Sequence, residues 1–354
     1  MKKKYFHYTL FVIFSGILIL EFSLRLYFSF SDNDIKALKR FPGRYISSYF
    51  TGYKLNPNWE LNHQTFQDKI NSIGLKSPEI AIKKQNNTYR IICIGGSLVY
   101  GKDIGTSWPH YLQMKLNERM REQEINFEVI NAGVPGYTSF HSIANFMTKL
   151  IDLEPDMVIM YQLFTDLYYY EYLDKELIIG DTFNPYNTNL SIDRLMDKSY
   201  IYVIIGALKR KFLSSNNDNE KILNSERTKV FQENDLKYYE RNVNIMASLS
   251  SLLNYKLLFC PPISLFKNEN TLEEKAIIAD IKSKQFYLDY ISNGKKLLKK
   301  ASENNMGVYY FDLSTKFTPS IDYLSDRYHP SVKGNKKIAN EIFKFLYENK
   351  ILKL

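Results

Sequence analysis

Ser97 follows an apolar run in the pattern Gly95-Gly96-Ser97. The run, residues 90–94, is typical of a buried strand, and glycines directly after a strand permit a tight turn and close approach of the backbone to a ligand. A serine in such a turn can present its hydroxyl as a nucleophile, and its N–H can stabilise an oxyanion. The alternative is a phosphate-binding turn, but no Gly-Lys-Ser/Thr follows. Ser97 is therefore a candidate nucleophile, although Gly-Gly-Ser alone is a weak signal.

Asp326 and His329 form a second candidate group, directly before Pro330 and a C-terminal helical pattern. Histidine suits general base catalysis near neutral pH. A carboxylate three residues earlier can reach back to the imidazole, fix its tautomer and stabilise the imidazolium. Pro330 is well tolerated at the first position of a helix and stiffens the turn. We expect His329 to be the base and Asp326 its orienting group; the alternative is an ordinary surface pair.

Gly136 ends the segment Asn131-Ala-Gly-Val-Pro-Gly136, which follows a second apolar run. A glycine N–H just past a strand end can approach a ligand oxygen closely, so Gly136 is a candidate oxyanion donor. The alternative is a plain turn glycine.

These candidates need a scaffold that brings distant segments together. From residue 89 onward, short apolar runs alternate with helical patterns, which predicts an α/β domain with a doubly wound parallel sheet. We expect a flavodoxin-like, three-layer arrangement with five strands in the order 2-1-3-4-5, whose ligands bind outside the carboxyl ends of the strands. The expected strands are 90–94, 127–131, 157–162, 255–260 and 308–312, and the expected helices are 107–123, 139–151, 233–252, 273–303 and 332–349.

The order of these segments resembles that of the SGNH hydrolases, also called GDSL-type esterases and lipases, from about residue 89 to the C-terminus. Residues 95–97 are similar to the first family block, with Gly96 where the signature has Asp, and residues 131–136 and 326–330 are similar to the second and last blocks. Further similar segments, of which the last two resemble membrane-anchored bacterial members, are Trp108-Pro109, residues 70–75 and Glu21-x-x-x-Arg25. The resemblance implies the SGNH fold and acyl transfer through Ser97, His329 and Asp326, without a metal or an organic cofactor.

The third family block departs from its pattern. The family has Gly-x-Asn-Asp after an apolar strand, whereas this chain has Thr165 in place of the oxyanion asparagine and retains Asp166. The resemblance therefore implies an oxyanion hole made of the Ser97 and Gly136 N–H groups with Thr165. A threonine hydroxyl reaches less far than an amide, and loss of one donor costs about a hundredfold or more in rate. Three interpretations stay open: a weakened enzyme, an enzyme with another donor such as Gln162, or a fold kept for binding.

The N-terminus carries a long apolar segment. Lys2 to Lys4 precede an apolar stretch that extends to Phe30, interrupted by Glu21 and Arg25. About 20 residues span a bilayer, and no small-residue cleavage site is present, so an uncleaved signal anchor over residues 1–30 is expected rather than a cleaved signal peptide. The basic N-terminus favours a cytoplasmic start and a single pass, with the catalytic part outside the cytoplasm.

The rest of the chain divides into two further parts. Residues 31–88 look irregular and are expected to be a juxtamembrane segment that packs on the main domain, residues 89–354. Within that domain, residues 171–232 break the α/β rhythm and are expected to form a lid-like insertion, with membrane-surface contact as an open alternative.

Composition excludes some functions. The 354 residues carry a net charge of +9, but Lys and Arg are scattered rather than clustered on a nucleic-acid-binding motif, so no nucleic-acid partner is expected. Cys93 and Cys260 sit in apolar runs and read as buried free thiols, and no metal-ligand spacing is present.

We therefore expect a serine-dependent ester hydrolase or O-acyltransferase acting on an acyl ester of a cell-envelope glycan or lipid. One alternative is a catalytically weak or inactive envelope protein that binds a glycan or a partner through the same cleft. Another is a flavodoxin-like nucleotide or flavin binder, which would need phosphate-loop chemistry that residues 95–101 lack.

Overall fold

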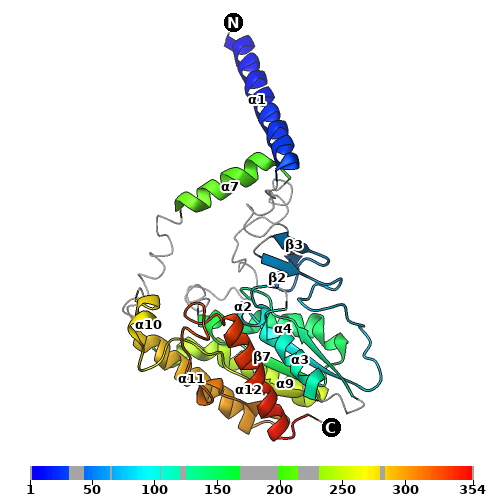
Figure 1. Ribbon diagram of the computed structural model, residues 1–354, viewed down its shortest axis with the longest axis vertical. Helices are drawn as coiled ribbons and strands as arrows, with labels where there is room; N and C mark the ends of the chain where they lie inside the picture. The colour runs from blue at the N-terminus through cyan, green and yellow to red at the C-terminus, as the bar shows by residue number, and fades with distance from the viewer. Residues whose placement is uncertain are drawn as a thin grey trace.

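The protein is described from a computed structural model (Figure 1). The described residues are 2–31, 44–63, 66–103, 105–119, 125–167, 198–213, 231–279 and 284–352.

A five-stranded parallel sheet forms the centre of the main domain. Its strands, in the spatial order β6-β5-β7-β8-β9, are β5 (Thr88–Gly95), β6 (Asn126–Asn131), β7 (Met157–Tyr161), β8 (Lys256–Phe259) and β9 (Val308–Tyr310). Every neighbouring pair is parallel. In chain order this is 2-1-3-4-5, so the predicted flavodoxin-like α/β fold is confirmed. The central strand β7 is buried along its whole length, as expected for a sheet covered on both faces.

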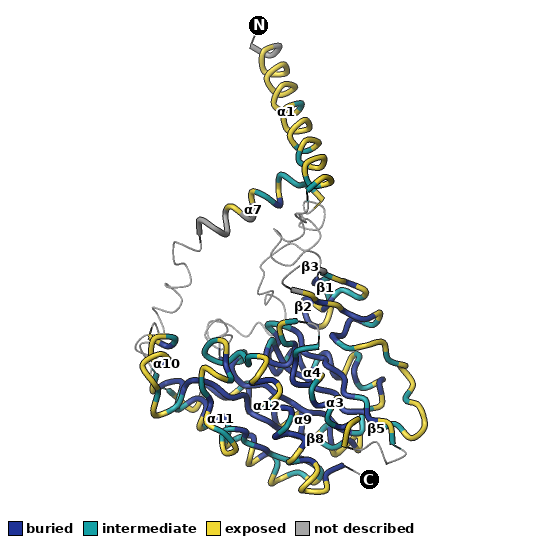
Figure 2. Tube along the Cα trace, viewed as in Figure 1, coloured by how far each residue is buried: buried dark blue, intermediate teal, exposed yellow. Residues whose placement is uncertain are grey.

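Two groups of helices cover the sheet (Figure 1). One group consists of α3 (Trp108–Arg119), which packs on α12 (Val332–Glu348). The other consists of α4 (Ser139–Thr148), α9 (Lys237–Leu253) and α11 (Lys284–Glu303), in which α9 packs on both of the others. Their apolar faces and the strands enclose one continuous core, seen as the dark blue interior of Figure 2.

The predicted helices agree with the observed ones except at residues 273–303. There the structure has two helices, α10 (Leu272–Ile277) and α11, and residues 280–283 between them lie outside the described residues. α10 has its own N-terminal cap, in which Thr271 and Glu274 form a reciprocal capping box.

Residues 44–69 are not irregular, contrary to expectation. They contain two antiparallel hairpins, β1 (Tyr45–Ser48) with β2 (Gly52–Leu55), and β3 (Glu60–His63) with β4 (Phe66–Lys69). Four-residue strands are too short for a clear periodic signal. They are stabilised by a second, smaller core shared with the main domain, whose members are Tyr45, Tyr53, Leu55, Trp59, Ile70, Tyr100, Val134 and Tyr137.

The helix α1 (Lys2–Phe30) stands apart from the main domain and is exposed along almost its whole length (Figure 2). Its segment Tyr5–Phe30 is long and apolar enough to cross a membrane. The expected insertion at about 171–232 lies mostly outside the described residues; its described helix, α7 (Tyr200–Leu213), packs against α1 (Figure 1).

Candidate active site

Ser97 stands where strand β5 turns into the short helix α2 (Ser97–Tyr100), at the carboxyl edge of the sheet. Gly95 makes this turn possible, because a Cβ there would lie 2.5 Å from the Tyr161 carbonyl oxygen and 2.6 Å from a Val99 methyl group. The two residues before Ser97 are glycines for a steric reason: a Cβ on Gly96 would lie 3.0 Å from Thr165 Oγ1. The turn thus has little room for a side chain at either position.

Ser97, His329 and Asp326 form a continuous chain of hydrogen bonds. Ser97 Oγ lies 2.8 Å from His329 Nε2, and His329 Nδ1 lies 2.7 Å from Asp326 Oδ2. Ser97 and His329 are 232 residues apart in sequence, so only the fold brings them together. The polar partners imply the tautomer with hydrogen on Nδ1, which leaves Nε2 to accept the serine proton.

Asp326 is held by its own loop. Its Oδ1 accepts the backbone N–H groups of Tyr328, at 3.0 Å, and of His329, at 2.8 Å. Partial burial opposes ionisation, but the hydrogen bond and charge of His329 and these two N–H groups outweigh it and lower the pKa of Asp326. The carboxylate therefore stays ionised near neutral pH.

The histidine loop is fixed from three directions. The Ser325 N–H donates to the His329 carbonyl at 2.8 Å and closes the turn. The Tyr328 ring stacks on Phe164, with ring centroids 5.4 Å apart. Helix α12 begins just after the loop, and the Ser331 hydroxyl caps it by accepting the Gly334 N–H at 3.1 Å. The imidazole is thus positioned by packing as well as by Asp326.

Gly136 and Thr165 lie near the same turn. Gly136 has a φ of +84°, a conformation that favours glycine, within a turn closed by the Tyr137 N–H on the Val134 carbonyl at 3.0 Å. That turn lies against Gly96, because a Cβ there would be 3.3 Å from the Tyr137 carbonyl oxygen. Among the described residues, the N–H groups of Ser97 and Gly136 and the Thr165 hydroxyl have no hydrogen-bond acceptor.

Gln162 is not available as a substitute oxyanion donor. Its side chain is buried, and its amide nitrogen donates to the Tyr137 carbonyl at 2.8 Å and to Asp166 Oδ2 at 3.2 Å. Both amide hydrogens are therefore engaged behind the Gly136 turn. Of the alternatives that the sequence left open, the one with Gln162 as donor is removed.

Asp166 organises a buried polar group that the sequence did not predict. Its carboxylate accepts the Ser139 N–H at 3.0 Å and the Ser139 hydroxyl, and Asn242 donates to that same hydroxyl at 2.7 Å. Burial raises the pKa of Asp166 to about 6, against the hydrogen bonds from Ser139 and Gln162. Asp166 thus joins the start of α4 to the segment that carries Thr165. No motif in the sequence marked Ser139 or Asn242 as a partner of Asp166.

A family model described as GDSL-like lipase/acylhydrolase matches residues 91–342. The chain belongs to this family. The matched range begins in β5 and ends in α12, so it includes both Ser97 and His329. The family description gives the class of reaction, hydrolysis of acyl esters.

Solved structures of esterases are similar to this chain at low identity. Axe2, an acetylxylan esterase from Geobacillus stearothermophilus, is 16% identical, with 73% of this chain and 93% of that chain covered and a TM-score of 0.40. A GDSL-like lipase from Bacteroides thetaiotaomicron is 12% identical, with 76% and 93% covered and a TM-score of 0.39. No curated protein matches the sequence.

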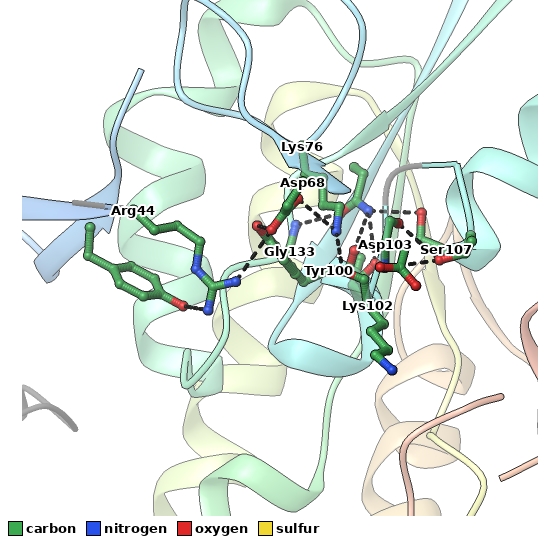
Figure 3. Close-up of polar contacts among 12 residues, drawn as sticks. Arg44, Asp68, Lys76, Tyr100, Lys102, Asp103, Ser107 and Gly133 are labelled. Atoms are coloured by element: carbon green, nitrogen blue, oxygen red, sulfur yellow. Dashed lines mark hydrogen bonds and ion pairs between the residues drawn. The ribbon is translucent and has the colours of Figure 1, made fainter. Parts of the chain in front are cut away.

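In this GDSL-like hydrolase, a buried charge cluster contacts Tyr100, the last residue of helix α2 (Figure 3). Asp68, at the end of the second hairpin, accepts a short hydrogen bond from the Tyr100 hydroxyl of α2. Lys76 Nζ lies 3.0 Å from Asp68 Oδ1 and 4.0 Å from the centre of the Tyr100 ring. Arg44 Nη1 lies 3.4 Å from Asp68 Oδ2. The buried carboxylate therefore has two cationic partners, which offset the cost of its burial.

The first hairpin supports the Gly136 turn through two hydrogen bonds and a ring contact. The Tyr53 hydroxyl donates to the Pro135 carbonyl at 2.8 Å, and the Tyr137 hydroxyl donates back to the Tyr53 carbonyl at 2.7 Å. The Tyr53 and Tyr137 rings meet edge to face, with centroids 5.3 Å apart. Tyr53, Asp68 and Lys76 thus contact both of the turns that line the candidate site, and none of these three residues lies in a motif that the sequence predicted.

Proposed function

We propose that this GDSL-like hydrolase cleaves or transfers acyl esters by a Ser97-His329-Asp326 mechanism. The observation that carries the proposal is the unbroken hydrogen-bond chain from Ser97 Oγ to Asp326 Oδ2, with 2.8 and 2.7 Å links. In the first step, Ser97 Oγ attacks the ester carbonyl carbon while its proton moves to His329 Nε2. Asp326 stabilises the resulting imidazolium through Nδ1.

The next steps return the proton. When the tetrahedral intermediate collapses, the carbon–oxygen bond to the alcohol breaks and the imidazolium protonates the leaving alkoxide oxygen. His329 then takes a proton from water or from an acceptor hydroxyl, whose oxygen attacks the acyl-serine carbonyl carbon. When the bond between the acyl carbon and Ser97 Oγ breaks, the imidazolium returns the proton to Oγ, which restores Ser97 and neutral His329. Water gives hydrolysis and a sugar hydroxyl gives O-acyl transfer.

The oxyanion is assigned to the N–H groups of Ser97 and Gly136, with the Thr165 hydroxyl as third donor. Two observations support this assignment. The three groups have no hydrogen-bond acceptor among the described residues, and Thr165 Oγ1 lies beside Gly96. A hydroxyl donor in place of an amide implies weaker stabilisation of the oxyanion, so slow turnover is expected.

The substrate is proposed to be an acyl ester of a cell-envelope glycan or lipid, with the catalytic domain on the extracytoplasmic side. Segment Tyr5–Phe30 has the length and hydropathy of a single membrane span, and Lys2 to Lys4 precede it. An anchored domain meets esters that are themselves fixed in the envelope more often than it meets free ones.

Serine-reactive labelling tests the proposal. A fluorophosphonate probe should label the wild-type protein and fail to label Ser97→Ala, while a variant at another partly exposed serine, Ser302→Ala, should label like the wild type. Ser302 lies near the end of α11, and its hydroxyl bonds to Lys299 in the same helix. A folded wild-type protein without labelling would favour the alternative of a non-catalytic binding protein.

A further inference from the structure

The helix α7 is attached to α1 through a specific polar contact. Glu21 of α1 accepts the N–H groups of Tyr200, at 2.9 Å, and of Ile201, at 3.1 Å, together with the Ser199 hydroxyl at 3.0 Å. These are the donors that a helix N-terminus leaves unsatisfied, so Glu21 caps α7 from another helix. The contact joins residues about 180 positions apart in sequence.

Arg25 completes this contact from the next turn of α1. Its Nε donates to Glu21 Oε1 at 3.0 Å, its Nη2 donates to the Lys198 carbonyl, and its guanidinium lies 4.8 Å from the centre of the Tyr200 ring. Both charged residues that interrupt the apolar α1 are therefore used to hold the start of α7.

The composition of α7 does not suit an aqueous surface. Residues 200–208 are apolar apart from two tyrosine hydroxyls, and the next three are Lys209, Arg210 and Lys211. Ile205 is 58% exposed and Leu208 is 49% exposed. The helix has 14 residues, about 21 Å, which is too short to span a bilayer. A helix that combines apolar side chains with Lys and Arg is typical of segments that lie in a membrane interface.

The position of Glu21 along α1 suits a helix attached at the edge of the hydrocarbon layer. With a rise of about 1.5 Å per residue, Glu21 lies about 26 Å along α1 from Lys4, close to the roughly 30 Å thickness of the hydrocarbon layer. If Lys4 marks the inner boundary, Glu21 lies just inside the outer one. The start of α7 is then held at the level where acyl chains meet headgroups.

We propose that α7 lies in the outer lipid interface, docked on α1 through Glu21 and Arg25, with the exposed side chains of Ile205 and Leu208 in the acyl layer. This inference rests on the proposed membrane anchor. The insertion leaves the main domain after Leu167 and rejoins it at Phe231, so α7 ties the domain to the membrane a second time. The partner is the bilayer itself.

Spin labels on the full-length protein in nanodiscs of phosphatidylcholine and phosphatidylglycerol test the depth of α7. The two native cysteines, Cys93 and Cys260, are fully buried and burial raises their thiol pKa values, so an added exposed cysteine is labelled selectively. Ile205→Cys probes α7. Leu18→Cys, which is 53% exposed on α1, and Met306→Cys, which is 94% exposed on the main domain, are the lipid and water references.

The Ile205 label should collide with oxygen more often, and with a water-soluble nickel chelate several-fold less often, than the Met306 label does. Collision rates equal to those at Met306, with the Leu18 label in lipid, overturn the proposal for α7 and leave the anchor intact. Water-like behaviour at Leu18 overturns the anchor itself. Low access to both reagents with spin–spin broadening identifies contact with a second copy of the chain and also overturns the lipid proposal.

A pair of labels at Leu18 and Ile205 tests the docking. The distance distribution between them should be narrow, and Glu21→Ala should broaden it. Ser29→Ala is the matched control, since the Ser29 hydroxyl bonds only to Leu26 within α1. An unchanged distribution in Glu21→Ala would refute the role of Glu21.

Discussion

Replacing Asp326 by asparagine should disable the histidine without removing it. Asp326 uses Oδ1 for two backbone N–H groups and Oδ2 for His329 Nδ1. An asparagine that keeps its one oxygen on the two N–H groups turns its NH₂ group toward Nδ1. The imidazole must then carry its hydrogen on Nε2, where it can no longer accept the Ser97 proton.

The size of the loss follows from this tautomer change. The equivalent change in a serine protease lowers kcat by about 10⁴. The Asp326 side chain here is 50% exposed, so water can partly compensate. We expect a loss in kcat of about 10³, or about 4 kcal/mol of transition-state stabilisation. His329→Ala removes the base itself and should cost more, toward about 10⁶ as in other triads.

Hydrolysis of p-nitrophenyl acetate, with the burst of p-nitrophenol as a count of acylated sites, measures both losses. Asp322→Asn is the control, since Asp322 lies in the same region and its carboxylate pairs with exposed Lys333 at 3.3 Å. A loss of less than tenfold in Asp326→Asn, or a loss equal to that of His329→Ala, would refute the reasoning about Asp326.

Three further predictions concern neighbouring residues. Thr165→Asn should raise kcat about tenfold or more by restoring an amide donor; a fall in kcat would show that the hydroxyl is the better fit. Tyr100→Phe should lower the free energy of unfolding in urea by about 1.5–3 kcal/mol, because Asp68 loses a charged hydrogen bond; no change would contradict this. The pKa of Asp166 is raised, so the folded state binds its proton more tightly, and stability should fall as the pH rises from about 4 to 6. Asp166→Asn should remove that slope in urea titrations.

The alternation of short apolar runs with helical patterns predicted most of the fold. The five apolar runs predicted the strands and their order because a doubly wound parallel sheet buries its strands on both faces, which makes them readable without partners. The end of α10 at Ile277 was not predicted, because no proline and no glycine marks it in the sequence, and the capping box at Thr271 marks only where α10 begins.

The site was predictable only where its residues carry a local motif. Ser97, Gly136 and the pair Asp326 and His329 stand beside glycines, prolines or a helix start, and the structure places them at one edge of the sheet. Asp68 and Tyr53 have no such motif, since their roles depend on contacts with residues 32 and 82 positions away. Gln162 was considered as a donor because of its place after β7, but its burial against Tyr137 could not be inferred from the sequence.

Mass spectrometry of the trapped protein tests whether Ser97 forms the acyl intermediate. Full-length protein is treated with a fluorophosphonate, digested and mapped. We expect one phosphonyl adduct, on the peptide that contains Ser97, and slower formation of that adduct in His329→Ala. An adduct on a different residue, or equal labelling in His329→Ala, would show that Ser97 is not a nucleophile activated by His329.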